Sequence, residues 1–225
     1  DIYPYEFWQS TMTVLFPDRE FTREAAQFAL EELAPPEGML IAAFDPDPSY
    51  VGLTLAEIAA ARGRPAVDVY LELIAEVAAI DGRESVIARS MISDDIGVFL
   101  SWPHTNVSSD GSLAGRHPRG FGAFTRVLAL HVRERGDVTL EEAIRRMTSL
   151  AAEHMGLVNR GTLAAGAFAD FVLFDPRTVT DRATPESPNE PSVGIAGVWV
   201  NGEQVYGSEG TTGARPGRIL RKTAR

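Results

Sequence analysis

Apolar residues recur at helical spacing through much of the first ninety residues. Between residues 65 and 80, Val69, Leu73 and Val77 repeat every four positions, with further apolar residues beside them. Such a broad apolar face is typical of a helix packed on a core. The pattern therefore predicts helical structure between loops in this part of the chain.

Local signals place the ends of two more helices. Thr22 can cap a helix that runs to Leu33, before the Pro35-Pro36 pair. The segment from Thr54 to Glu57 has the spacing of a capping box, and Gly63 is placed to end that helix. These helices are expected to act as a scaffold or lid.

The pattern changes after Glu84 to short strand, helix, short strand. Residues 85–88 are a buried-strand candidate, a helix is expected from Ser93 to about Trp102, and a second strand covers residues 106–108. Alternation of this kind builds a parallel sheet or barrel, and it leads directly into Ser109-Asp110-Gly111. Asp110 is therefore expected at a strand end, where α/β enzymes place their chemistry.

The last third of the chain moves from helices to strands. Helices are predicted over residues 124–135 and 140–147, the second opened by a capping box from Thr139 to Glu142. Residues 169–174 and 197–206 have strand character, and Asn201-Gly202 is a strong two-residue hairpin signal. The C-terminal part is therefore expected to be a small β module.

Composition excludes several classes of partner. The net charge of −10 argues against a phosphate-backbone ligand, which needs clustered Lys and Arg. The sequence contains no run of about 18 apolar residues, so it predicts no membrane span. The chain has no Cys, which fits a cytoplasmic protein and excludes a thiolate metal ligand. The opening residues, Asp1 to Tyr5, suggest a cut or processed end.

Asp110 is the leading candidate for chemistry. A carboxylate at a strand end can bind a metal and accept a proton from a water whose pKa a zinc ion lowers to about 7. The same Asp-Gly pair is also ordinary turn chemistry, so this dipeptide alone leaves both interpretations open.

The residues after Asp110 strengthen the interest of this segment. Arg119 can bind a substrate carboxylate through two parallel hydrogen bonds, whereas Arg116 is expected to be solvated. His104 and His117 lack the spacing of metal ligands, so other roles are favoured, and His131 and His154 fall in helical segments. Nucleophile-elbow, Walker and dinucleotide-binding motifs are absent from the sequence, which leaves metal-assisted hydrolysis as the favoured chemistry.

Several strings, in order, resemble the D-aminoacylases, or N-acyl-D-amino-acid deacylases, of the amidohydrolase superfamily. The resemblance covers most of the chain and is carried by residues 1–5, 109–111, 117–119, 122–128, 139–148, 160–162, 166–176 and 200–202. It implies the C-terminal part of a (β/α)₈ TIM barrel with a helical insertion at about 15–80, followed by a small C-terminal β domain. On this basis residues 1–155 belong to the barrel and 156–225 to the β module and tail.

The resemblance also implies roles for four residues. Asp110 would be a metal ligand and the general base and acid, Arg119 would bind the substrate α-carboxylate, and Tyr3 would hydrogen-bond near the scissile amide. Ser10 would also face the substrate. The cofactor would be one or two zinc ions, whose other ligands precede this sequence in the family. An upstream N-terminal half or a companion chain is therefore expected as a partner.

The function expected from this resemblance is metal-dependent hydrolysis of an N-acyl-D-amino acid to a D-amino acid and a carboxylate. Two alternatives remain open. One is another amidohydrolase reaction, such as that of a dipeptidase or a cyclic-amide hydrolase, because a fold does not fix a substrate. The other is a non-catalytic fragment or subunit that lacks the upstream metal ligands.

Overall fold

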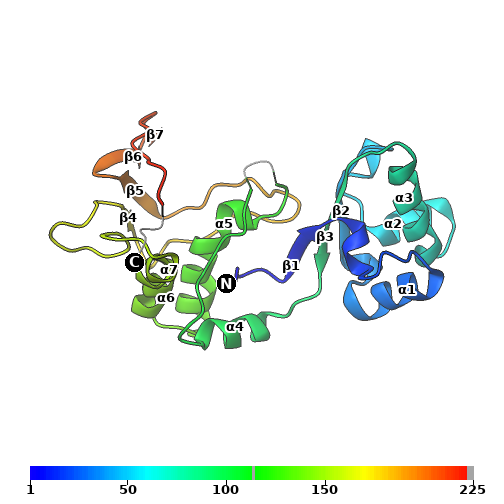
Figure 1. Cartoon of the computed structure of the whole chain (residues 1–225), viewed down its shortest axis with the longest axis horizontal. Coiled ribbons are helices and arrows are strands. Elements are labelled where there is room, and N and C mark those ends of the chain that lie inside the picture. The colour runs from blue at the N-terminus through cyan, green and yellow to red at the C-terminus, as the bar shows by residue number, and fades with distance from the viewer. Residues whose placement is uncertain (113–114, 222–225) are drawn as a thin grey trace. The chain divides into compact units, whose positions relative to one another are not determined.

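The computed structural model describes residues 1–112 and 115–221 (Figure 1). The chain divides into two compact units, and each is described by itself. The first unit joins the N-terminal segment Asp1–Pro4 to Ser93–Arg225, and the second is formed by Tyr5–Ile92. Asp110 and Arg119 therefore share a unit with the first four residues of the chain.

The second unit packs helices against a small antiparallel sheet (Figure 1). Its core includes Phe16 and Tyr70, whose rings stack with centroids 5.5 Å apart. The sheet order is β1-β3-β2. The strands are β1 (Phe7–Ser10), β2 (Met39–Phe44) and β3 (Glu84–Arg89), and the helices are α1 (Arg23–Phe28), α2 (Leu55–Arg62) and α3 (Ala66–Ala79).

The predicted helix boundaries of this unit are confirmed, but its sheet was not predicted. Thr22 caps α1, which continues as a π-helical segment, Ala29–Leu33, to the predicted end. Thr54 and Glu57 form the reciprocal capping box at the start of α2. Gly63 ends α2 in the left-handed conformation, at φ 64°. The predicted strand at residues 85–88 is present as part of β3, but it pairs antiparallel with both neighbours rather than in a parallel sheet. Strands β1 and β2 are additional to the expected helices.

The described part of the first unit combines helices with an antiparallel sheet of order β4-β5-β6-β7. Helix α5 continues without a break as a π-helical segment, Val127–Glu134. The helices are α4 (Ser93–Ser101), α5 (Arg119–Arg126), α6 (Leu140–Met147) and α7 (Ser149–Met155). The strands are β4 (Phe171–Phe174), β5 (Ile195–Val200), β6 (Glu203–Gly207) and β7 (Gly210–Thr211).

The predicted C-terminal hairpin is confirmed. Strands β5 and β6 pair antiparallel and are joined at Asn201 and Gly202, whose φ angles are 50° and 84°. Positive φ at both central residues is the geometry that an Asn-Gly turn provides for a hairpin. On β4 and β5, Phe171 and Trp199 face one another as cross-strand partners, and their rings stack at 4.6 Å.

One predicted helix begins earlier than expected. The sequence predicted a helix from residue 124, whereas α5 begins at Arg119. Pro118 takes the position before the helix, where a residue without an N–H costs no hydrogen bond. Arg119 therefore projects from the first turn of a helix.

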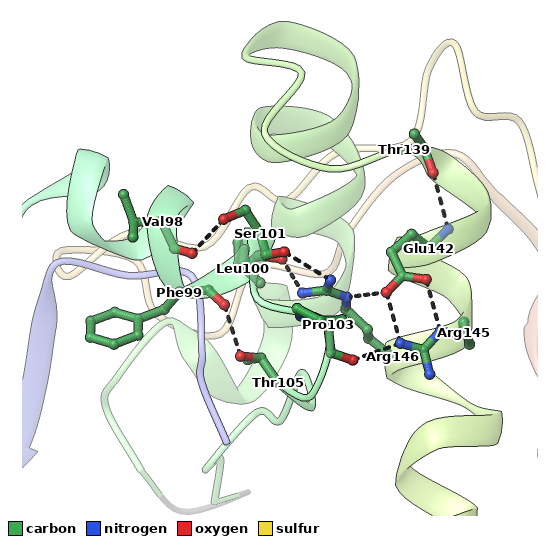
Figure 2. A network of polar contacts seen from close by, with 10 residues as sticks. All are labelled: Val98, Phe99, Leu100, Ser101, Pro103, Thr105, Thr139, Glu142, Arg145 and Arg146. Atoms are coloured by element: carbon green, nitrogen blue, oxygen red, sulfur yellow. Dashed lines mark hydrogen bonds and ion pairs between the residues drawn. The ribbon is translucent and has the colours of Figure 1, made fainter.

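A buried guanidinium ties α6 to the end of α4 (Figure 2). Arg146 is 2% exposed and donates hydrogen bonds to the carbonyl oxygens of Leu100 and Ser101. Its Nε also donates to Glu142 at 2.8 Å. This network fixes the end of α4, from which the chain runs through Thr105 to the segment that carries Asp110.

Candidate active site

The N-terminal segment lies against the chain that leads to Asp110. Ile2 forms a parallel bridge with Val107, and the Ile2 N–H donates to the Asn106 carbonyl at 3.0 Å. The N–H of Ser108 donates in turn to the Ile2 carbonyl at 2.9 Å. These bonds bring Tyr3 alongside Ser108 to Asp110, although more than a hundred residues separate the two segments.

Helix α5 holds the same segment from a second direction. Arg126, the last residue of α5, donates from Nε to the Pro4 carbonyl at 2.8 Å. Arg119, the first residue of α5, lies with its guanidinium carbon 4.7 Å from the centre of the Tyr3 ring. Both ends of one helix therefore contact the dipeptide Tyr3-Pro4.

Asp110 and Arg119 form an ion pair at this place. The distance between Asp110 Oδ2 and Arg119 Nη2 is 3.0 Å. The Arg119 side chain is only 11% exposed, whereas that of Asp110 is 62% exposed. The guanidinium is thus anchored inside the protein while the carboxylate reaches solvent, where it is open to a ligand or a substrate.

Backbone packing keeps the two charged residues close. A Cβ placed on Gly111 would lie 2.6 Å from the Gly120 Cα, a separation that real Cβ atoms essentially never show. Only glycine at position 111 lets this segment approach the first turn of α5 so closely. Asp110 itself has a φ of 45°, in the left-handed region that Asp and Asn tolerate better than most residues.

Burial favours the protonated form of Tyr3. The pKa of Tyr3 is raised above its usual value, mainly by burial of the phenol, with a smaller contribution from the Asp110 charge. The Arg119 guanidinium acts in the opposite direction and does not cancel the effect of burial. At neutral pH Tyr3 therefore has a hydroxyl proton to donate.

The structure places the remaining candidate residues outside this cluster or beside it. Ser10 ends β1 in the second unit and pairs with Val86. His104 is exposed and contacts the ring of Trp102, and His131 is buried with Nδ1 2.7 Å from Asp137. His117 is buried beside Tyr3 and Arg119, a placement that the sequence pattern did not reveal.

Asp110 fits one position of a metal site. Its carboxylate offers an exposed oxygen of the kind that zinc and other divalent ions accept. Within residues 1–112 and 115–221, however, no group of three or more His, Cys, Asp or Glu side chains could hold a metal ion. The described residues thus provide one candidate ligand and not a complete site.

The matching family model is that of the amidohydrolase family, over residues 23–206. The chain belongs to this family. Among curated relatives of Alcaligenes xylosoxydans xylosoxydans, a D-aminoacylase is 41% identical over 80% of this chain and 36% of its own length. An N-acyl-D-glutamate deacylase is 39% identical over 100% of the chain and 41% of its own length. The chain therefore spans about two fifths of these relatives, and the resemblance predicted from the motifs is confirmed.

Solved structures of amidohydrolases agree with this assignment. The N-acyl-D-glutamate deacylase of Bordetella bronchiseptica, complexed with zinc and a phosphonate inhibitor, has a TM-score of 0.80 and 37% identity. That match covers 98% of this chain and 42% of the other. A D-aminoacylase variant in complex with copper has a TM-score of 0.81 at 35% identity, over 98% of this chain and 42% of the other. These homologous structures carry bound metal ions.

No helix in the part of this amidohydrolase chain that the structure describes has the length and apolar character needed to cross a bilayer.

Proposed function

We propose that this chain contributes the proton-transfer and carboxylate-binding half of an enzyme that hydrolyses N-acyl-D-amino acids to a D-amino acid and a carboxylate. The observation that carries the proposal is the ion pair of Asp110 and Arg119, a solvent-reaching carboxylate 3.0 Å from a buried guanidinium. Family membership supports the reaction class, and relatives named deacylases of D-amino acids support the substrate class.

The proposed metal is zinc, as one or two ions. When bound, it would polarise the amide carbonyl and make a water molecule more acidic. Asp110 would supply one oxygen ligand, and we propose that the other ligands come from polypeptide outside these 225 residues. The support for this is that the relatives are more than twice as long as the segment they share with this chain. From the family resemblance we propose that residues 1–155 belong to a (β/α)₈ barrel and 156–225 to a β module and tail.

Asp110 moves the proton in this proposal. Its carboxylate takes a proton from the attacking water as the new C–O bond forms at the amide carbon. The C–N bond then breaks, and Asp110 returns the same proton to the leaving amine nitrogen. One carboxylate thus serves first as a base and then as an acid, and it ends the cycle as it began.

Arg119 and Tyr3 orient the substrate. A guanidinium has five N–H donors, so Arg119 can hold a substrate α-carboxylate while it remains beside Asp110. The Arg119 side chain is largely buried and lies over the Tyr3 ring. It therefore loses less conformational freedom when a substrate binds. The protonated hydroxyl of Tyr3 is a donor for the oxygen of the scissile amide. For Ser10 we propose a substrate contact on the strength of the family resemblance alone.

The test compares Arg119→Met with Arg116→Met, a matched control because Arg116 is an exposed arginine three residues before Arg119. Both are made in the longest natural polypeptide that contains this chain, loaded with zinc. We expect Arg119→Met to lower kcat/KM for N-acetyl-D-methionine and N-acetyl-D-glutamate by about ten- to two-hundred-fold, since a hydrogen bond to a charged group contributes about 1.5–3 kcal/mol. Arg116→Met should change it less than threefold.

Two results would contradict the proposal. Equal losses on an N-acyl amine, which has no carboxylate, would favour another amidohydrolase reaction. Absence of zinc and of hydrolysis in every polypeptide tested would favour a non-catalytic subunit.

A further inference from the structure

His117 occupies an unusual position at the start of α5. It is 3% exposed, and its Nδ1 accepts the backbone N–H of Arg119 at 3.0 Å. The first N–H groups of a helix have no partner within the helix. Pro118 has no N–H to satisfy, so the Arg119 N–H is the first donor of the helix, and a buried ring nitrogen receives it in place of water.

The same ring also contacts Tyr3. The centroids of the His117 and Tyr3 rings are 5.7 Å apart, with an interplanar angle of 73°, which is the edge-to-face arrangement that aromatic rings favour. Tyr3 is therefore in contact with two groups, the edge-on imidazole of His117 and the guanidinium of Arg119. His117 thus contacts both residues proposed to orient the substrate.

This geometry also fixes the chemical form of the imidazole. To accept an N–H, Nδ1 must be unprotonated, so the ring proton of a neutral His117 lies on Nε2. The imidazole acts here as a hydrogen-bond acceptor and a packing surface. Both roles act through the Arg119 backbone and the Tyr3 ring.

We propose that His117 is a positioning residue, which sets the direction of the Arg119 guanidinium and the Tyr3 ring so that an α-carboxylate is held in one orientation. The identity of the ligand in this proposal rests on the proposed function. The statement that the His117 acceptor holds the Arg119 backbone is independent of the proposed function. Both parts follow from one hydrogen bond and one ring contact, and both can be measured separately.

The test compares His117→Leu with His117→Asn in the same zinc-loaded polypeptide. Asn places its Oδ1 close to the position of the histidine Nδ1, so it retains the acceptor and loses the ring, whereas Leu loses both. His104→Leu is a matched control, since His104 is an exposed histidine that contacts Trp102. Metal content and melting temperature show whether each variant is folded.

The first readout is hydrogen exchange of the Arg119 amide, which needs no activity. We expect His117→Leu to speed this exchange at least tenfold and His117→Asn to restore it to within about threefold of the wild type. Exchange that is unchanged in His117→Leu, or equally fast in both His117 variants, would overturn the proposal.

The second readout is the division between KM and kcat for N-acetyl-D-methionine. We expect His117→Leu to raise KM about tenfold with kcat within about twofold, because a misdirected guanidinium weakens carboxylate binding before it affects proton transfer. An equal rise in KM for an N-acyl amine, which has no carboxylate, would overturn the carboxylate role. A wild-type protein without hydrolytic activity but with the expected exchange pattern would overturn the proposed function and retain the positioning role.

Discussion

The first unit contains two ion pairs of the same type in different surroundings, Glu142 with Arg146 and Asp110 with Arg119. Arg146 and Arg119 are both largely buried, at 2% and 11% exposure. Glu142 accepts hydrogen bonds from Arg146 and Arg145, and Arg146 donates further bonds to two backbone carbonyls (Figure 2). Asp110 meets Arg119 through Oδ2 and is 62% exposed, against 30% for Glu142. The first pair is committed to the fold, whereas the second leaves a carboxylate available for a reaction.

The charge state of Glu142 follows from its surroundings. Hydrogen bonds from Arg145 lower the pKa of Glu142 to about 2, against the opposing effect of desolvation, and Arg146 adds to the lowering. A carboxylate stabilised so strongly as an anion is a poor acceptor for a proton at neutral pH. Glu142 is therefore suited to a structural role.

The substitution Asp110→Asn is expected to have the largest effect, and it tests the contrast between the two ion pairs most directly. Asn tolerates the left-handed φ of 45° and keeps the side-chain shape, so the free energy of unfolding should change by less than about 0.5 kcal/mol. Activity of the zinc-loaded polypeptide should fall by about 10²–10⁴-fold, the usual contribution of general acid and base catalysis. Steady-state hydrolysis and a thermal melt measure the two effects. A variant that loses stability but keeps its activity per folded molecule would reverse the assigned roles.

The matched opposite is Arg146→Met. This change leaves the Leu100 and Ser101 carbonyls without their donor and removes one partner of Glu142. Breaking a buried pair costs about 3–5 kcal/mol, and the access of Glu142 to water favours the lower end, about 3 kcal/mol. Urea unfolding followed through hydrogen exchange of α6 measures the loss. A loss below about 1 kcal/mol would show that the network contributes little to the fold.

How much of this could be predicted from the sequence depends on the range of the interaction. The caps at Thr22 and Thr54 and the Asn201-Gly202 hairpin use bonds between residues a few positions apart, and all three are confirmed. Strand β1 was missed because its partner, β3, is about eighty residues away, as in the pair Phe7 and Arg89. A short segment gives little periodicity by which such pairing could be found.

The candidate site shows the same division. The sequence identified Asp110 and Arg119 through their residue types and their place after a predicted strand, and the structure brings them to 3.0 Å. The place of Tyr3 depends on the bridge between Ile2 and Val107, which no local pattern encodes, so it was expected only through the family resemblance. The position of His117 depends on α5 beginning at Arg119, and that boundary was predicted too late.

The pH dependence of stability tests whether the charge of Glu142 stabilises the fold. Its pKa of about 2 lies below the ordinary value of 4.5, so its contribution is complete above pH 4.5 and is lost as pH falls towards 2. The Glu142→Gln variant lacks this contribution at every pH, because the Gln side chain does not titrate. The difference in urea midpoint between wild type and Glu142→Gln should therefore shrink as pH is lowered from 6 to 2.5. A difference that is constant with pH would mean that the charge of Glu142 does not stabilise the fold.

The smallest expected effect concerns Thr139, which the sequence placed in a reciprocal capping box with Glu142. The structure confirms one half: the Thr139 hydroxyl accepts the Glu142 N–H at 3.3 Å, whereas the Glu142 carboxylate turns to Arg145 and Arg146 (Figure 2). Thr139→Ala should therefore lower stability by about 1 kcal/mol, the cost of a single N-cap.

Thr54→Ala is the control for that change, because at α2 both halves of the capping box are formed. It should cost more than Thr139→Ala when the amide exchange of α2 and α6 is compared in the two variants. If Thr139→Ala instead cost as much as Arg146→Met, the start of α6 would depend on its cap and not on the arginine network. The network would then be a consequence of the helix position, and the contrast with Asp110 would rest on exposure alone.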